Sequence, residues 1–539
     1  MKPTLKKVLH VAIWIVIGIL IGSEIMLYLW KKQNVQIEYA LKSIGKGNKV
    51  SALLNAIDKS YVDSVDVDSL VNMVLPLILS ELDPHSAYYP AEETQESNNE
   101  LHGSFSGIGV QFSIQEDTIR VNSVINGGPS KKVGVLAGDK IIKINDSLFT
   151  GKNIKSEDVV KNLKGPSGTE VKISVLRNGD DNLIDFTIER GEIPVKSVDA
   201  AYMMNKEIGY IVINKFGETT YTEMMTGLAK LSKEGMKKLI VDLRSNTGGY
   251  LGAVIQMVNE FLPKGEMIVY TQGVHSPYAA QYANGRGRYQ DLPLVVLIDE
   301  SSASASEIFT GAIQDNDRGF VVGRRSFGKG LVQEPIEFTD GSSIRLTIAR
   351  YYTPSGRCIQ KPYGTDDEDY AMDIVKRYEH GEFFSADSVK LNENEIFKTK
   401  AGRTVYGGGG IMPDFFVPQD TIAYSEYYAS IVRKSLVNKY AFRYVDSRRN
   451  AFSKFEKADE IVSYLDKQNA LNNFISYASD NGVKRDSKTS SEAIKQLRIL
   501  LYANIIYNAL DMQEYIRFVN RDDNTVKKAI ESFSKRPNN

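Results

Sequence analysis

The chain has 539 residues, which is enough for three or four domains that each bury a core. Its 66 Lys and Arg balance 67 Asp and Glu, so it lacks the positive excess of nucleic-acid-binding proteins, and we expect no nucleic-acid partner. The single cysteine, Cys358, excludes an internal disulfide, and the five histidines show no metal-ligand spacing. We therefore expect no metal site and no cofactor.

An apolar segment runs from Val8 to Trp30, with Lys2, Lys6 and Lys7 before it and Lys31 and Lys32 after it. It is about long enough to span a bilayer of roughly 30 Å, and it lacks the short apolar core and small-x-small cleavage site of a signal peptide. We expect residues 1–32 to form an uncleaved anchor, with a buried core helix as the alternative. The more basic amino-terminal flank predicts a single-pass protein of the inner (cytoplasmic) membrane, with its body on the periplasmic side.

Residues 33–100 show helical periodicity, with apolar positions every three or four residues, and we predict packing helices there. Asp83-Pro84 is predicted to end the second of them, because helical geometry is disfavoured before a proline. From Gly103 apolar and polar residues alternate and glycines are interspersed, as in GSFSGIGVQFSI and EVKISVLR. Residues 101–192 are therefore predicted to form a small, strand-rich domain.

Strand and helix patterns alternate from Ile208, as in GYIVINKF, KLIVDLRS and LVVLIDE. They predict a multidomain α/β protein whose core, residues 193–420, contains buried strands. Within it, residues 363–410 are polar and glycine-rich at their end, which predicts an insertion of loops. Residues 421–539 are predicted to form a helical domain, because apolar residues fall at helical spacing, such as Ile494, Leu497, Leu501 and Ile505.

The segment SASASEI leads from an apolar strand into a helix that begins near Ala305. Small side chains leave Ser304 exposed at the helix mouth, where unpaired N–H groups and the helix dipole favour a developing oxyanion. This pattern predicts a nucleophile. Taken alone it also suits a plain helix cap or tight packing.

Lys329 lies between two glycines in FGKGLVQ, just after a predicted strand. If it is desolvated there, its neutral amine can take the serine proton. Gln333 has a side chain able to orient that amine by a hydrogen bond. A solvated turn lysine is the alternative, and a phosphate loop is weak because Gly330 follows instead of Ser or Thr.

SASASEI, FGKGLVQ, LRSNTGG and a preceding GIGV together resemble the carboxy-terminal processing peptidases, also called tail-specific proteases, over about residues 61–418. The resemblance implies a serine endopeptidase with a crotonase-like ββα core. It implies that Ser304 is the nucleophile, Lys329 the general base and Gln333 the residue that positions it, with Ser302 and Ser306 as neighbours only. It further implies an oxyanion hole formed by the backbone N–H of Ala305 and of a glycine in the NTGG loop, Gly248. Outside the resemblance, Asp242 and Arg244 could pair and brace that loop.

PDZ domains add a substrate tail as a strand at a sheet edge, while a glycine-bearing loop holds its terminal carboxylate. The GIGV segment fits that loop, and GVLAGDKIIKIN resembles PDZ domains of exported proteases. We expect Gly107, Ile108, Gly109 and Val110 to bind protein tails, with Ile108 and Val110 lining an apolar pocket for apolar or small ends. A generic β-rich substrate domain is the alternative. Family behaviour also suggests that the PDZ domain gates the site.

Two other residues are weaker candidates for chemistry. A histidine that follows a helix stop, like His85 in DPHSAYYP, more often caps carbonyls or fills a turn than acts as an acid. Cys358 has no histidine nearby in sequence to activate it. We expect neither to be catalytic.

Two rival functions belong to other classes. The first is a catalytically silent PDZ scaffold of the cell envelope, against which the intact Ser304, Lys329 and Gln333 argue. The second is a crotonase-like acyl-thioester enzyme, which the PDZ-like insert, the anchor and the lack of an acidic pair at the site disfavour. The expected partners are protein substrates, bound by their tails, and the membrane. The carboxy-terminal helices could also mediate dimerisation or recruit an adaptor.

Overall fold

The computed structural model describes residues 49–535 except 116, 126, 152, 178–179, 181, 365–369, 421–424 and 487–488. The anchor expected at residues 1–32 lies outside this part of the chain. Among the described residues, no helix combines the length and apolar character needed to cross a membrane. The chain divides into two units, Met1–Leu79 and Ser80–Asn539, and each is described by itself.

The first unit contains the helical periodicity that the sequence predicts. Its helices are α2 (Lys49–Ser60) and α3 (Val67–Ser80). Several of its apolar side chains face solvent, with Leu53 at 59% and Met73 at 68% exposure. The apolar side chains of α2 and α3 therefore remain largely exposed within this unit.

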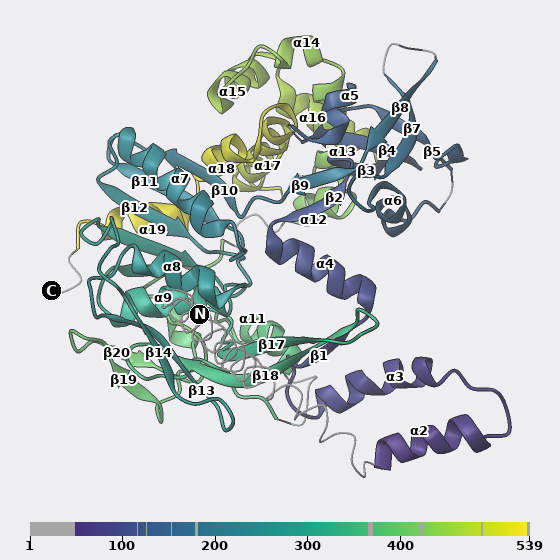
Figure 1. Ribbon diagram of the computed structural model, residues 1–539. Helices are drawn as coiled ribbons and strands as arrows, with labels where there is room; N and C mark the ends of the chain where they lie inside the picture. Colours follow the sequence, from purple (N-terminus) through teal and green to yellow (C-terminus); the bar gives the residue numbers. More distant parts are fainter. Residues whose placement is uncertain are drawn as a thin grey trace, which may run out of the picture. The chain divides into compact units, whose positions relative to one another are not determined.

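The second unit is built around a six-stranded sheet, in the order β10-β11-β12-β15-β16-β21. All neighbours in this sheet are parallel except β10 and β11. The strands are β10 (Val198–Met203), β11 (Ile208–Ile213), β12 (Lys238–Asp242), β15 (Leu294–Ile298), β16 (Phe320–Gly323) and β21 (Phe415–Phe416). The helices between them are α7 (Thr220–Lys233), α8 (Leu251–Asn259) and α9 (Ala305–Asp315). Figure 1 shows β10 and β11 of this sheet close to α7.

Both faces of this sheet are buried, which explains why its strands read as continuous apolar runs. Leu239 and Val241 pack in one core with α7, α8 and α9. Ile240, which points the opposite way, packs in a second core with Val526 and Ala529 of the carboxy-terminal helix α19. Helix α19 is therefore part of the core of the second unit.

A second, antiparallel sheet adjoins the first in this unit, in the order β1-β18-β13-β14, with β17 on the other edge of β18. Its strands are β1 (Ala87–Tyr89), β13 (Met267–Gln272), β14 (Ala279–Tyr282), β17 (Leu331–Glu337) and β18 (Ser343–Tyr352). The pairing of β1 with β18 places a strand inside the region 33–100, where the sequence pattern predicts helices. Helix α4 (Ala91–His102) follows β1.

A small antiparallel domain follows α4, with the strand order β3-β4-β5-β7-β8 and β6 paired to β5. Its strands are β3 (Val110–Gln115), β4 (Thr118–Val124), β5 (Lys140–Ile144), β6 (Ser147–Leu148), β7 (Glu170–Leu176) and β8 (Leu183–Glu189), and its helices are α5 (Pro129–Val133) and α6 (Ser156–Leu163). The strands β2 (Ser104–Gly107) and β9 (Gly191–Pro194), which precede and follow the domain in the chain, form a separate antiparallel pair. In this order β3 is an edge strand.

Residues 363–410, expected to be loops, contain regular elements in their described part. These are α11 (Asp373–Glu379), the short 3-10 helix η1 (Ala386–Ser388), and the hairpin β19 (Ile396–Lys398) with β20 (Thr404–Tyr406). The helices that follow are α12 (Glu426–Arg433), α13 (Leu436–Asp446), α14 (Arg449–Phe452), α15 (Ala458–Lys467), α16 (Ala470–Asp480), α17 (Ser491–Ala509), α18 (Met512–Val519) and α19 (Asn524–Ser532). Helices α12 to α18 share a core of their own, to which Leu497, Leu501 and Ile505 contribute. Helix α19 packs instead against the six-stranded sheet.

Candidate active site

Ser304 stands at the point where the buried strand β15 turns into α9, as the residue that caps the helix. Its backbone has φ 56° and ψ −115°, an unusual conformation for a residue with a side chain. Such strain costs roughly 1–3 kcal/mol and persists only where the surroundings enforce it. The strained turn leaves Ser304 half-buried in the wall of a groove, whereas both flanking residues are buried.

The neighbouring serines are engaged in structural hydrogen bonds. The Ser302 hydroxyl donates to the carbonyl of Leu243 at 2.8 Å, and the Ser306 hydroxyl donates to the carbonyl of Asn246 at 2.8 Å. Both side chains thus tie the helix mouth to the loop after β12. This agrees with their expected role as neighbours of the nucleophile.

Lys329 precedes β17 and lines the same groove as Ser304. Its amine donates to Gln333 Oε1 at 2.8 Å, which is the orienting contact that the sequence suggests. In the described part of the chain the hydrogen bond of this amine runs to Gln333 and not to Ser304. Burial, and after it the charge of Arg345, lower the pKa of Lys329 from its ordinary value.

The Gln333 side chain is itself held by a segment that the sequence reasoning assigned to a turn. Its Nε2 donates to the backbone carbonyl of His85. The carboxylate of Asp83 in turn accepts hydrogen bonds from the N–H of His85 at 2.8 Å and from the Thr347 hydroxyl at 3.1 Å. Asp83 therefore links this segment to β18 and fixes the carbonyl that orients Gln333.

The imidazole of His85 does not contact Ser304 among the described residues; its Nε2 lies 2.7 Å from the Tyr370 hydroxyl. Burial, with the nearby charge of Lys329, lowers the pKa of His85 to about 4, so the ring is neutral at neutral pH. The turn role expected for this residue is compatible with that geometry. The sequence did not indicate that the His85 carbonyl holds Gln333, the residue that orients the predicted base Lys329.

The NTGG loop lies directly against Ser304. A Cβ added to Gly248, which has φ +108°, would lie 2.7 Å from Ser304 Cβ and 3.0 Å from Ala305 N, so only glycine allows this approach. The Gly248 N–H donates to Asn246 Oδ1 at 2.9 Å. The expected oxyanion donor is thus next to the nucleophile but is engaged within its own loop in this state, and its role stays a prediction.

Asp242 and Arg244 pair and brace this loop, as the sequence suggests. The Arg244 guanidinium donates to Asp242 at 2.6 Å and also to Asp523 at 2.6 Å. Asp523 caps α19 by accepting hydrogen bonds from Thr525 N–H and Val526 N–H. The pairing of Arg244 with Asp523, 279 positions later in the chain, had no signal in the sequence.

Glu307 is a buried carboxylate that the sequence reasoning missed. It accepts hydrogen bonds from the N–H of Ser304 at 2.9 Å, of Gly328 at 2.8 Å and of Lys329 at 2.9 Å, and from the Ser326 hydroxyl at 2.5 Å. Burial raises its pKa to about 7, although these four donors favour the ionised form. One carboxylate thus joins the backbone of the predicted nucleophile to that of the predicted base.

Tyr351 links the same two residues, Ser304 and Lys329, through their backbone carbonyl groups. Its hydroxyl lies within hydrogen-bonding distance of the Ser304 carbonyl, at 3.0 Å, and of the Lys329 carbonyl. The ring is buried at 1% exposure, so this contact is shielded from water. Ser304 and Lys329 are therefore held together through their main chains on two sides.

The groove that contains these residues has a volume of about 860 Å³. It is lined from α4 by Ser97, Asn98 and Leu101, from the NTGG loop by Thr247 to Gly249, and from the second sheet by Leu331, Val332, Gln333, Pro335 and Arg345. These walls leave room for an extended polypeptide across Ser304. The arrangement supports acyl transfer by a serine that shares this groove with a desolvated amine.

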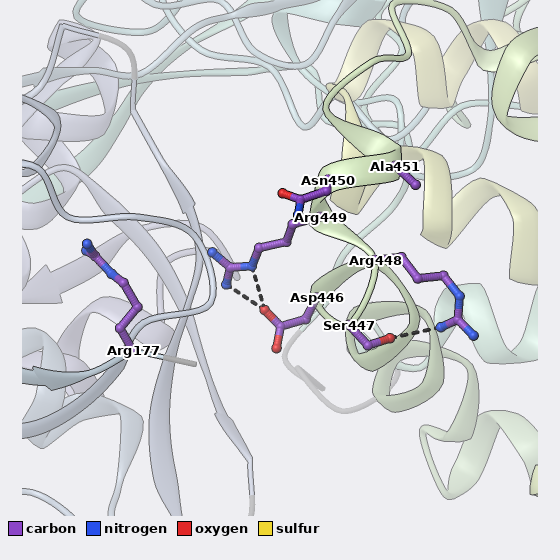
Figure 2. A pocket seen from close by; sticks show the side chains of 7 residues that line it. All are labelled: Arg177, Asp446, Ser447, Arg448, Arg449, Asn450 and Ala451. Atoms are coloured by element: carbon purple, nitrogen blue, oxygen red, sulfur yellow. Dashed lines mark hydrogen bonds and ion pairs between the residues drawn. The ribbon is translucent and has the colours of Figure 1, made fainter. Parts of the chain in front are cut away.

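A separate cavity of about 450 Å³ holds no such pair (Figure 2). It lies between Arg177, which follows β7, and residues 446–451 at the junction of α13 and α14. Two of its three arginines form ion pairs, Arg177 with Asp139 at 2.7 Å and Arg449 with Asp446 at 2.5 Å. The cavity lacks a nucleophile with a base, and we assign it no catalytic role.

In the small domain, the GIGV segment joins β2 to the edge strand β3. Gly109 has φ +74°, and a Cβ there would lie 2.9 Å from Ile193, so the loop requires glycine. Ile108 is 3% exposed and belongs to the core of the domain, with Val110 packed partly against that core. Ile108 is therefore part of the domain core, and the apolar tail pocket that Ile108 and Val110 are expected to line stays a prediction.

Comparisons with known proteins identify families to which parts of the chain are similar. Residues 207–370 match peptidase family S41, residues 106–188 match the PDZ domain, and residues 427–511 match a family of unknown function. The solved photosystem II D1 C-terminal processing protease is 22% identical, with 68% of this chain and 91% of that chain covered and a TM-score of 0.34.

Two curated relatives extend over most of their own length. A probable CtpA-like serine protease of Staphylococcus aureus is 34% identical over 364 residues, which cover 66% of this chain and 72% of the relative. A carboxy-terminal-processing protease of Bartonella bacilliformis is 35% identical over 349 residues, with 64% and 78% covered. With a PDZ domain ahead of an S41 region and relatives at this level of identity, the chain belongs to the carboxy-terminal-processing serine peptidases of family S41.

Proposed function

We propose that the chain is a membrane-anchored, exported endopeptidase that captures protein substrates by their carboxyl ends and cuts them with Ser304, Lys329 and Gln333. The observation that carries the proposal is the meeting of Ser304 and Lys329 in one groove, with the amine held 2.8 Å from Gln333 Oε1. The lowered pKa of Lys329 supports its role as a base, because a larger fraction of its amine is neutral at a given pH.

In the proposed reaction, the Ser304 hydroxyl attacks the carbonyl carbon of the scissile bond and passes its proton to the neutral Lys329 amine. The tetrahedral oxyanion is stabilised by the N–H of Ala305 and of a glycine of the NTGG loop, Gly248 once its bond to Asn246 opens. The lysine ammonium then gives its proton to the leaving nitrogen, and an ester forms on Ser304. Water activated by Lys329 hydrolyses that ester and restores the hydroxyl.

The PDZ domain supports tail recognition as the first step. The edge strand β3 offers one free side for an added strand, and the Gly107–Val110 loop precedes it directly. We propose that the substrate tail pairs with β3 and that its terminal carboxylate meets the N–H groups of this loop. A free carboxylate is then required for efficient turnover.

We also propose a crotonase-like core and a location at the membrane. The alternation of parallel strands β11, β12, β15 and β16 with α7, α8 and α9 supports a crotonase-like ββα core. The apolar segment from Val8 to Trp30 and its basic flank support a single-pass anchor with the body in the periplasm. Recovery of the full-length chain in the membrane fraction, with its body sensitive to external protease in spheroplasts, is the expected result.

The catalytic proposal is tested with the full-length protein in detergent. The substrate is an unstructured polypeptide with an apolar carboxyl end, offered with a free carboxylate and as its amide. We expect cleavage that disappears in Ser304→Ala, persists in the matched variant Ser301→Ala, and slows for the amide. Equal cleavage by wild type and Ser304→Ala would show that another nucleophile acts. Equal rates for the free carboxylate and the amide would contradict the proposed binding of the tail by the PDZ domain.

A further inference from the structure

The groove that crosses Ser304 is lined by positive charge. Its charged lining residues are Lys215, Lys329 and Arg345, and none of the described residues that line it is an Asp or Glu. When Lys329 is neutral, as its proposed role requires, two cations face the groove. A cleft with charge of one sign concentrates partners of the opposite sign.

Arg345 has the features of a binding group rather than of a structural ion pair. Its contacts among the described residues are neutral: a hydrogen bond to the Ser97 hydroxyl, and the ring of Tyr89, whose centroid lies 4.7 Å from the guanidinium carbon. A guanidinium has five N–H donors, so most of its capacity is unused by these contacts. Glu337, further along the same face of β17, accepts from Asn98 at 3.2 Å and does not line the groove.

The position of Arg345 relative to the catalytic groups follows from the register of two strands. Arg345 pairs with Pro335, and Thr347 pairs with Gln333, the residue that orients Lys329. Gln333 and Pro335 are two residues apart on one face of β17, which corresponds to about 7 Å along the strand. The free edge of β17 also runs along the groove, so an extended substrate would pass Arg345 close to its scissile bond.

We propose that Arg345 forms a carboxylate-binding subsite, so that the peptidase favours bonds with an Asp or Glu of the substrate within about three residues of the cut. This inference rests on the proposed function of the groove. Ser97 supports the subsite by holding one side of the guanidinium. The partner it selects is an acidic side chain in an extended polypeptide, distinct from the terminal carboxylate that the PDZ domain is proposed to hold.

The test uses the full-length enzyme and matched pairs of unstructured peptides with one Glu or Gln, placed in turn at each of the three positions on either side of the cut. At the best position we expect kcat/KM for the Glu peptide to exceed that for the Gln peptide by about five- to tenfold at low salt. In Arg345→Gln this ratio falls to about one. Arg345→Lys retains part of it, because lysine keeps the charge without the planar fork.

Arg350 provides the control, because it is an exposed arginine on the same strand that donates to Tyr363 and does not line the groove. Arg350→Gln should keep the wild-type ratio. A salt concentration of about 0.5 M should reduce the wild-type ratio, since exposed ion pairs are screened. Equal wild-type rates for Glu and Gln at every position, or a preference that survives in Arg345→Gln, would overturn the subsite.

A binding measurement separates this inference from the catalytic proposal. The same peptides are titrated into Ser304→Ala and into Ser304→Ala combined with Arg345→Gln, and binding is followed by fluorescence anisotropy. A preference for Glu that is lost in the double variant supports the subsite even if the wild type cuts none of the peptides. Equal affinity for Glu and Gln peptides in Ser304→Ala refutes it, whatever the outcome for cleavage.

Discussion

Glu307 accepts a hydrogen bond from the backbone N–H of Lys329 at 2.9 Å, although the two residues are 22 positions apart in the chain. The same carboxylate accepts the N–H of Ser304, three positions before it. Lys329 is thereby positioned relative to Ser304 by a shared buried acceptor and not only by the packing of its own loop. We regard Glu307 as a positioning residue that acts through the main chain of the other two.

We predict that Glu307→Gln lowers kcat by about 10- to 100-fold with little change in KM, because small displacements of catalytic groups reduce rate steeply. An amide has one acceptor oxygen and turns an NH2 group towards N–H donors. Steady-state kinetics with the tail-bearing polypeptide measures the effect. A KM that rises with kcat unchanged would instead place Glu307 in substrate binding.

Glu307 also makes the stability of the protein depend on pH. Its folded pKa of about 7 lies above the ordinary value of 4.5, so the folded state binds the proton more tightly than the unfolded state. The stabilisation is complete below pH 4.5 and is lost as pH rises through 7. The free energy of unfolding of the wild type, measured with urea, should therefore be lower at pH 8 than at pH 5, and Glu307 should account for about 3 kcal/mol of that difference. Glu307→Gln should lack this contribution.

Activity should rise with pH as Lys329 loses its proton. Burial and Arg345 lower the pKa of Lys329, so the midpoint of this rise lies below its ordinary value of 10.5. Arg345→Gln removes a charge that opposes the protonated amine, and the midpoint should move to higher pH. The profile of kcat/KM against pH for a neutral peptide shows it, and Arg350→Gln should leave the midpoint where it is. A shift to lower pH would contradict this account.

Gln333→Ala should lower kcat by about 10- to 100-fold, because it frees the Lys329 amine from its acceptor and breaks the link to the His85 carbonyl. Glu334 is the control, since it is exposed and points to the other face of β17. Glu334→Ala should retain wild-type kcat. Comparable losses in both variants would mean that the strand, not the side chain, matters.

Gly248→Ala should abolish measurable cleavage, because its Cβ would lie 2.7 Å from Ser304 Cβ. Gly265 provides a matched control, with φ +87° and nothing within 4 Å of an added Cβ. Gly265→Ala therefore introduces similar backbone strain without crowding the site. It should lose about 1 kcal/mol of unfolding free energy and keep its activity. An active Gly248→Ala would show that the NTGG loop lies farther from the nucleophile.

Asp523→Asn should lower the unfolding free energy by about 1–3 kcal/mol and also reduce kcat. Asparagine keeps the cap of α19 but removes the ion pair with Arg244, which braces the loop after β12. Asp522→Asn, at the exposed neighbouring position, should change neither quantity. Thermal unfolding and kcat measured on the same preparations decide it.

Much of the second unit follows from local sequence patterns. The buried runs around Ile240 and Val296 predict parallel strands of an α/β core, because such strands are covered on both faces. The small residues before α9 and the glycines around Lys329 indicate the nucleophile and base candidates, since both patterns are local. The Lys329–Gln333 contact could also be predicted from the sequence, because its partners are only four positions apart.

What the sequence alone determined is the type of the core strands and helices, the motifs and the residues that are candidates for chemistry, because these depend on neighbours along the chain. It missed β1, α11 and the hairpin of β19 and β20. The tertiary structure decided which distant groups support them. Glu307 reads as an ordinary acidic residue in the first turn of a helix until folding surrounds it with the N–H groups of Gly328 and Lys329. The His85 carbonyl and the Asp523 carboxylate likewise reach the site only through pairing and packing across hundreds of residues, and such long-range contacts carry no local signal.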